Sequence, residues 1–225
     1  MRLSGIAFDA FGTLFDLDGL RGRARKAVGD RGGELYDLLL ARLVPSTWHA
    51  TAAGAYRPFG ELAVLALQAA ARELELELSE SQAHEIAAGL SSLAAYPDAD
   101  EALAGLAGRE LAVLSNGTRE GVQSMVAAAG LSDRFAHLLV ADDVGFFKPA
   151  PEIYAQAVTA FGGPANSILL VSGNEWDVAG AKLAGLRAAW ISRGRRTTRF
   201  LGVESDLVAE QLADVPDAVR RLEAA

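Results

Sequence analysis

Cysteine is absent from this chain of 225 residues, which excludes disulfide bonds, thiolate catalysis and zinc–thiolate sites. No run of about 18 apolar residues occurs, so no membrane span is expected. The first residues reach the acidic Asp9 without the basic and then apolar segments of a signal peptide. From these absences we expect a cytoplasmic protein with no membrane partner.

Positively charged residues are fewer than negatively charged ones: the chain has 21 Lys and Arg residues and 29 Asp and Glu residues, which gives a net charge of -8. This balance predicts no nucleic-acid partner. One basic stretch occurs, and we interpret it as a solvated loop; it contains Arg193, Arg195, Arg196 and Arg199. The 51% hydrophobic and 22% charged residues indicate a globular chain, long enough for one α/β domain with a modest insertion.

Short apolar runs alternate with helical patterns, which predicts buried parallel strands joined by helices. The expected strands are Leu3–Phe8, Leu111–Leu114, His137–Val140, Ile168–Val171 and Ala188–Ile191. The expected helices between the last four strands are Gly121–Ala129, Glu152–Phe161 and Val178–Ala184. This order predicts an α/β fold with a Rossmann-like, doubly wound parallel sheet.

The segment between the first two strands carries helical patterns only. The expected helices are Arg21–Val28, Glu34–Trp48, Glu61–Leu74 and Ser79–Leu93, and Ser79 with Gln82 forms the pattern of a capping box. We therefore predict a small all-helical cap at residues 17–93, inserted after strand one of a catalytic core made of residues 1–16 and 94–225.

Polar residues gather just past the predicted strand ends, where ligands bind in open α/β sheets. The four segments are Asp9–Asp16, Ser115–Thr118, Phe147–Pro149 with Tyr154 beyond it, and Ser172–Asp177. Asp9 ends an apolar strand, where a charge is costly unless it is paired or functional. Its position fits covalent catalysis by a carboxylate, with Lys148 as the neutralising cation.

Each segment taken alone also has a plain structural interpretation. The Asp9–Thr13 segment fits a strand-to-turn cap, Ser115–Thr118 an ordinary turn, and Tyr154 and Trp176 ordinary packing residues. Their occurrence in order at four strand ends favours a shared site.

Together the motifs resemble those of the haloacid dehalogenase superfamily, and within it the type II (L-2-haloacid) dehalogenases. The first motif is F-D-A-F-G-T-L-F-D at Phe8–Asp16, and the second is L-S-N-G at Leu114–Gly117. The third is Lys148 before a proline, followed by Tyr154, and the fourth is S-G-N-E-W-D at Ser172–Asp177. The resemblance covers essentially the whole chain and implies a helical cap over the crevice of a Rossmann-like core; such enzymes are often homodimers.

The resemblance also implies a mechanism for a small haloacid substrate. Asp9 would displace halide from C2, and water would hydrolyse the resulting aspartyl ester. Asp9 and the water would be oriented by Thr13, Ser172, Asn174 and Asp177, and Lys148 would balance charge with Tyr154 alongside. Ser115 and Asn116 would bind the substrate carboxylate, while Phe11, Phe59 and Trp176 would wall the pocket.

Most members of the superfamily are phosphatases, which carry a second aspartate two residues after the nucleophile. Here that position is Phe11, which cannot donate a proton to a leaving group. Phosphoryl transfer brings two anions together and uses a metal to screen them, whereas a halide leaves without a proton. We therefore expect no metal and no cofactor.

One departure from the family concerns a cap arginine that helps to receive the halide. An ungapped alignment places Leu40 at that position, with Leu39 in place of the preceding tryptophan. Arg42 lies two residues further, about 200° around a helix, and should face away from the crevice. Arg57 is another candidate for the residue that receives the halide.

Two alternative functions stay open. One is a related hydrolase of another small organic acid or phosphate, and the other is a non-enzymatic binding module.

Overall fold

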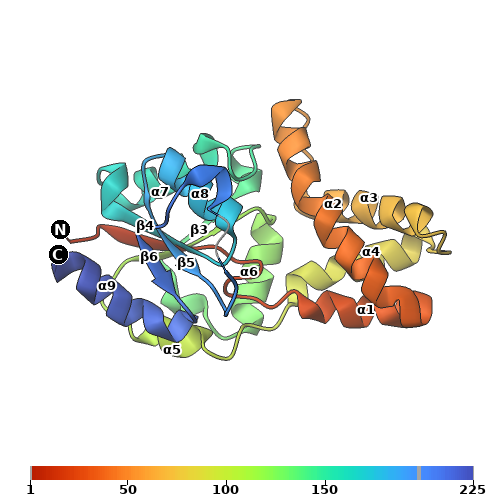
Figure 1. Cartoon of the computed structure of the whole chain (residues 1–225), viewed down its shortest axis with the longest axis horizontal. Helices are drawn as coiled ribbons and strands as arrows, with labels where there is room; N and C mark the ends of the chain where they lie inside the picture. Colours follow the sequence, from red (N-terminus) through yellow and green to blue (C-terminus); the bar gives the residue numbers. More distant parts are fainter. Residues whose placement is uncertain (1, 197–198, 225) are drawn as a thin grey trace.

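The computed structural model describes residues 2–196 and 199–224 and contains a parallel sheet at its centre (Figure 1). In these residues the sheet has six strands in the order β3-β2-β1-β4-β5-β6. The strands are β1 (Gly5–Phe8), β2 (Leu111–Ser115), β3 (His137–Val140), β4 (Ile168–Ser172), β5 (Arg187–Ile191) and β6 (Leu207–Ala209). The five predicted strands are confirmed, because their apolar runs are buried between helices on both faces.

The sequence did not predict β6, which has only three residues and lies at the edge of the sheet. Its central residue, Val208, is 61% exposed, so no buried apolar run marks this strand. It pairs in parallel with β5, with Ala189 opposite Leu207 and Ile191 opposite Ala209.

Helices cover both faces of the sheet, as right-handed crossovers require (Figure 1). The core helices are α5 (Ala99–Ala104), α6 (Arg119–Ala128), α7 (Pro151–Phe161), α8 (Glu175–Leu183) and α9 (Val215–Ala224). In Figure 1, α7 and α8 lie on one face of the sheet while α5 and α9 lie together on the other. Helices α5 and α9 were not predicted. α5 has only six residues, whereas α9 carries apolar residues at helical spacing and buries Val215, Ala218 and Val219.

Four further helices form a separate group beside the core (Figure 1). They are α1 (Asp18–Val28), α2 (Gly32–Ala52), α3 (Phe59–Glu73) and α4 (Glu80–Ala88). The capping box of α4 is confirmed, because the Ser79 hydroxyl accepts from the Gln82 amide while the Gln82 side chain accepts from the Ser79 amide. Helix α2 packs against α1 and α3, and α3 packs against α4.

The two chain segments that join this helical group to the core are hydrogen-bonded to each other. The Asp16 amide donates to the Ala94 carbonyl at 2.9 Å, and the Tyr96 amide donates to the Leu14 carbonyl at 2.9 Å. The segment that leaves β1 and the segment that returns to α5 are thus held side by side, which fixes where the helical group meets the carboxyl ends of the strands.

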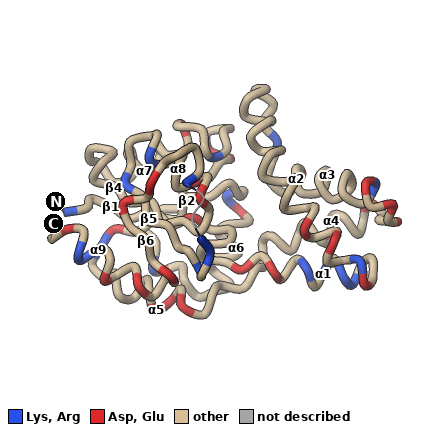
Figure 2. Tube along the Cα trace, viewed as in Figure 1, with Lys and Arg blue, Asp and Glu red and all other residues tan. Residues whose placement is uncertain are grey.

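Charged residues of both signs are interspersed along the core and the helical group (Figure 2). In residues 2–196 and 199–224, none of the helices has the length and apolar character needed to cross a bilayer.

Close packing of α7 on the sheet leads to a stability prediction at Gly5. A Cβ atom added there would lie 2.2 Å from the ring of Phe161, a buried side chain at the end of α7. We expect Gly5→Ala to lower the free energy of unfolding by about 1–3 kcal/mol, as overpacking does, measured by urea denaturation.

Gly22→Ala is the matched control, because this exposed position in α1 has no atom near the added Cβ. It should leave stability unchanged or raise it by up to about 1 kcal/mol through helix propensity. Equal stabilities of the two variants would show that Phe161 moves aside at little cost.

Candidate active site

The polar segments predicted from the sequence meet at the carboxyl ends of the central strands. Asp9 follows β1, and its amide donates to the Val171 carbonyl of β4 at 3.0 Å. Ser115 ends β2 and Ser172 ends β4, while Lys148 lies in the loop before α7. All four side chains are buried, so the sheet brings residues far apart in sequence into one water-poor cluster.

The Asp9 carboxylate is held on both of its oxygens. Oδ1 accepts from Lys148 Nζ at 2.9 Å. Oδ2 accepts from Thr13 Oγ1 at 2.7 Å and from Asn174 Nδ2 at 2.9 Å, with Ser172 Oγ more distant at 3.5 Å. With its side chain only 5% exposed, Asp9 is thus a fixed carboxylate rather than a freely rotating one.

Lys148 lies between two carboxylates and is completely buried. Its Nζ donates to Asp9 and, at 2.9 Å, to Asp177 Oδ2. Burial alone would lower the pKa of Lys148, but the attraction of Asp177 and Asp9 outweighs it and raises that pKa above its usual value. Lys148 therefore carries a proton at neutral pH and compensates the buried negative charge.

Asp177 and Tyr154 form the inner side of this cluster. The Tyr154 hydroxyl donates to Asp177 Oδ1 at 2.8 Å, and burial raises the pKa of that phenol well above its usual value. Burial raises the pKa of Asp177, and the repulsion of Asp9 raises it further. The attraction of Lys148 lowers this pKa but does not cancel the two other effects. A Cβ atom on Gly180 would lie 2.4 Å from the Tyr154 hydroxyl, so only glycine leaves room for this contact.

Further hydrogen bonds fix the loops around the cluster. The Gly173 amide donates to Thr13 Oγ1 at 2.8 Å, and Asn174 Nδ2 also donates to the Phe11 carbonyl at 3.0 Å. Both contacts join the loop after β4 to the loop after β1. Gly12, in the loop after β1, has a positive φ of 77°, a conformation that glycine adopts without strain.

The two residues predicted to bind substrate after β2 form contacts within the protein. The Ser115 hydroxyl accepts from the Gly117 amide at 3.0 Å and is fully buried. The Asn116 side-chain oxygen accepts from the Lys148 amide at 2.8 Å. Since that oxygen is occupied, a contact of Asn116 with substrate would use its amide nitrogen. Substrate binding by these two residues stays a prediction.

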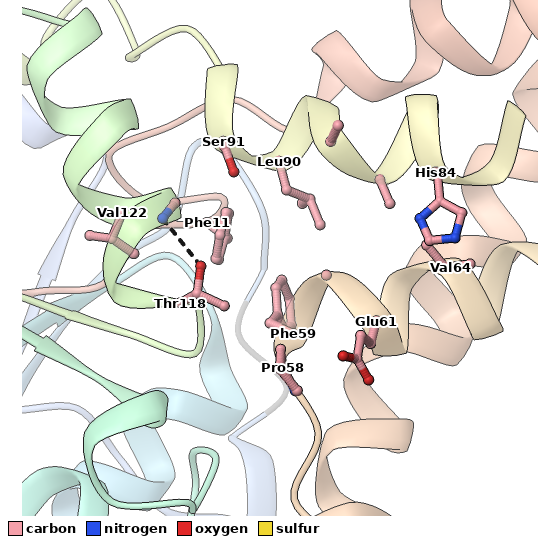
Figure 3. A pocket seen from close by; sticks show the side chains of 15 residues that line it. Phe11, Pro58, Phe59, Glu61, Val64, His84, Leu90, Ser91, Thr118 and Val122 are labelled. Carbon is pink, nitrogen blue, oxygen red and sulfur yellow. Dashed lines mark hydrogen bonds between the residues drawn. The ribbon is translucent and has the colours of Figure 1, made fainter. Parts of the chain in front are cut away.

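Aromatic side chains connect the core to the helical group. Phe11 stacks on Phe59 of α3, with ring centroids 5.1 Å apart. Both line a cavity of about 300 Å³ between the two parts, with apolar neighbours that include Val64, Leu90 and Val122 (Figure 3). Trp176, the third residue expected around the substrate, packs edge-on against Trp48 of α2 with ring centroids 5.9 Å apart. Neither Trp176 nor Asp9 is among the residues that line this cavity, and a contact of Trp176 with substrate stays a prediction.

Neither basic residue proposed to replace the family's cap arginine points its charge at Asp9. Arg42 forms an ion pair with Glu73 of α3 within the helical group. Arg57 is 61% exposed and lies 3.8 Å from Glu61. Leu40 is partly buried among apolar residues. The cation nearest to Asp9 among these contacts is therefore Lys148.

Two arginines of the loop after β5, predicted to be solvated, contact the loops of the site. Arg193 donates to the Thr13 carbonyl at 3.2 Å, and Arg195 donates to the Gly173 carbonyl. The prediction of a solvated loop holds, since Arg195, Arg196 and Arg199 are exposed, but Arg193 and Arg195 also donate hydrogen bonds to the loops of the site. No signal in the sequence distinguishes them from Arg196, because the contacts depend on how β5 and β6 place the loop.

In the part of the chain that the structure describes, no group of three or more His, Asp or Glu side chains is arranged to hold a metal ion. Asp9 and Asp177 are separated by the Lys148 ammonium, which occupies the place between them. Independence from metal stays a prediction.

Comparisons with known proteins identify the family of the chain. A family model described as haloacid dehalogenase-like hydrolase matches residues 3–185. The chain is 34% identical over 206 residues to an (S)-2-haloacid dehalogenase of Pseudomonas sp. (strain YL), covering 91% of this chain and 89% of the relative.

Solved structures give the same result. The L-2-haloacid dehalogenase from Xanthobacter autotrophicus superposes with a TM-score of 0.90 at 30% identity, covering 97% of this chain and 99% of that chain. A structure of that enzyme with chloropropionic acid covalently bound gives a TM-score of 0.89 at 30% identity, covering 97% of this chain and 98% of that chain. The chain belongs to the haloacid dehalogenase-like hydrolase family.

Proposed function

We propose that this hydrolase converts short (S)-2-haloalkanoic acids to 2-hydroxy acids through an ester on Asp9. The observation that carries the proposal is the Asp9 carboxylate, fixed by Thr13, Asn174 and Lys148 at the end of β1 and followed two residues later by Phe11 instead of an acid. The relatives named (S)-2-haloacid dehalogenase and the covalent chloropropionate structure support the same chemistry.

In the first step a carboxylate oxygen of Asp9 attacks C2, the carbon–halogen bond breaks, and the halide leaves with the bonding electron pair. In the second step water attacks the carbonyl carbon of the aspartyl ester. Asp9 is released as a carboxylate, the 2-hydroxy acid departs, and one proton is left for the solvent. This is nucleophilic catalysis in which one difficult displacement is divided into two.

The proposed roles follow the contacts of each residue. Thr13, Asn174 and the more distant Ser172 orient the Asp9 carboxylate. Lys148 offsets the charge of Asp9 and Asp177, and Tyr154 holds Asp177. We propose that Asp177 helps to orient the hydrolytic water. Ser115 and Asn116 are proposed to bind the substrate carboxylate, with Phe11, Phe59 and Trp176 around the alkyl group.

The organisation of the chain and its surroundings is part of the proposal. We propose that residues 17–93 act as the cap over a core of residues 1–16 and 94–225, supported by the separate helical group and its hydrogen-bonded connections. A homodimer and a cytoplasmic location are proposed from the family resemblance and from the absence of cysteine, respectively.

A second function has one observation in its favour. Leu40 stands where the resemblance implies a cation for the departing halide, and Arg42 and Arg57 pair with glutamates instead. A hydrolase of the same type that acts on another small organic acid or a phosphate would not need a halide-binding arginine.

The nucleophile gives the first test of this mechanism. Asp9→Asn should abolish turnover without loss of the fold, because Lys148 and Asp177 still balance each other as buried charges. In a single turnover with the unchanged enzyme in oxygen-18 water, mass spectrometry should find the label in Asp9. Label in the product alone, with unlabelled enzyme, would exclude the ester intermediate.

Metal dependence gives the second test and separates the two functions. Because Lys148 compensates the charge of Asp9 and a halide needs no proton to leave, haloacid hydrolysis should continue in excess chelator. Aryl phosphates serve as the parallel substrates. Activity that is lost with chelator and restored by magnesium would favour the phosphatase-like function.

The position of Leu40 gives the third test. A cation beside the departing halide stabilises the transition state more than the ground state, and loss of one such preorganised group costs about a hundred- to a thousandfold in rate. We expect slow turnover of 2-chloropropionate by the natural chain and a gain with Leu40→Arg, measured by halide release.

Ala41→Arg is the control for Leu40→Arg, since this exposed neighbour in α2 receives the same charge away from the partly buried face. It should give no gain. Fast turnover by the natural chain, abolished by Arg42→Ala or Arg57→Ala, would instead show that one of these arginines receives the halide.

A further inference from the structure

The loop that follows β5 is fixed to the sheet by backbone hydrogen bonds to β6. The Ser192 amide donates to the Ala209 carbonyl at 2.8 Å, and the Arg193 amide donates to the Glu210 carbonyl at 2.9 Å. These bonds continue the pairing of β5 with β6 past the strand ends. The loop therefore leaves the sheet at its carboxyl edge, the same edge on which Asp9 lies.

Arg193 contacts the loop of the nucleophile. Its guanidinium donates to the Thr13 carbonyl at 3.2 Å and stacks over the Tyr96 ring with 3.6 Å to the centroid. Asp98 Oδ1 lies 3.6 Å from the same guanidinium. The stacking and the nearby carboxylate fix the direction of a side chain that is only 23% exposed.

Arg195 contacts the loop after β4. One guanidinium nitrogen donates to the Gly173 carbonyl and, at 3.2 Å, to the Ile191 carbonyl. Its Nε donates to the Ser192 carbonyl at 3.0 Å. Three carbonyl groups thus share one planar donor group, a geometry that the ammonium of lysine does not reproduce.

The two contacted residues, Thr13 and Gly173, are themselves joined beside the nucleophile. The Gly173 amide donates to Thr13 Oγ1 at 2.8 Å, and that hydroxyl donates to Asp9 Oδ2 at 2.7 Å. The two loops touch so closely that a Cβ on Gly173 would lie 2.6 Å from the Gly12 carbonyl oxygen. Arg193 holds the carbonyl of one loop, and Arg195 holds the carbonyl of the other.

We propose that Arg193 and Arg195 are positioning residues, an arginine clamp that fixes the Thr13–Gly173 contact and through it the direction of the Asp9 carboxylate. The clamp lies beyond residues 3–185, the part of the chain that the family model matches. Its effect on rate rests on the proposed function, because Asp9 must approach C2 along one direction. A displacement of about 1 Å in such a geometry costs about a hundredfold in rate.

The test compares Arg195→Gln and Arg193→Gln with the control Arg196→Gln, which removes the same charge from an exposed side chain in the same loop. With 2-bromopropionate as substrate, kcat should fall about ten- to a hundredfold in the first two variants while KM changes by less than about threefold. Single-turnover kinetics should place the loss in ester formation. Arg195→Lys should recover only part of the rate, and low concentrations of guanidinium should partly rescue Arg195→Ala.

Amide hydrogen exchange of the unliganded protein gives a second readout that needs no substrate. The Gly173 amide reports the contact directly, because it donates to Thr13 Oγ1. It should exchange at least about tenfold faster in Arg195→Gln and Arg193→Gln than in Arg196→Gln, with urea unfolding little changed. A rate loss that follows only a loss of folded protein would overturn the proposal.

The two readouts also separate the clamp from the proposed function. If the natural chain does not hydrolyse haloacids, the proposed function fails. The hydrogen-exchange rate of the Gly173 amide then still tests whether Arg193 and Arg195 fix the Thr13–Gly173 contact. Unchanged exchange in both arginine variants overturns the clamp, as does a kcat equal to that of Arg196→Gln in an active enzyme.

Discussion

The rest of the site depends on two buried ion pairs, which the Lys148 ammonium forms with Asp9 and with Asp177. Removing three charges from water is costly, and the cost is offset only because each carboxylate also receives hydrogen bonds from neighbouring groups. Thr13 and Asn174 donate hydrogen bonds to Asp9, and Tyr154 donates one to Asp177. The loop after β1, the loop before α7 and the start of α8 must therefore meet in one arrangement, which makes the carboxylate a preorganised nucleophile.

The same arrangement explains why the site suits attack on carbon better than phosphoryl transfer. An ammonium already occupies the position between the two carboxylates, and Phe11 replaces the acid that would protonate an alkoxide leaving group. The helical group contributes aromatic and apolar side chains to the cavity at Phe11, whereas Arg42 and Arg57 pair with glutamates. The core thus supplies every described contact of the Asp9 carboxylate, and the helical group has leucine instead of arginine at position 40.

The proposed arginine clamp adds residues of the loop after β5 to those that organise the site. Arg193 and Arg195 donate to the backbone carbonyls of Thr13 and Gly173 and have no hydrogen bond to Asp9 itself among their described contacts, so their influence on Asp9 passes through loop geometry. β6 places them, although it has only three residues and one strongly exposed side chain. A weak edge strand thereby takes part in the organisation of the catalytic edge of the sheet.

The sequence by itself determined the strands β1–β5, the helical insertion and the residues of the central cluster. Continuous apolar runs report burial on both faces of a sheet, and polar residues at strand ends converge because parallel strands share one carboxyl edge. The sequence analysis did not predict α5 or β6, whose short length leaves little periodic signal. It also did not predict α9, although the apolar residues of that helix recur at helical spacing.

Only the tertiary structure decided which partner each polar group found. The Asn116 side chain accepts a hydrogen bond from the Lys148 amide, and Trp176 packs on Trp48. Arg193 and Arg195 contact loops that are about 180 and 22 residues away in the sequence. Local pattern reports burial and backbone conformation, whereas side-chain partners depend on how distant segments pack. That is why a basic loop and a positioning clamp have the same appearance in the sequence.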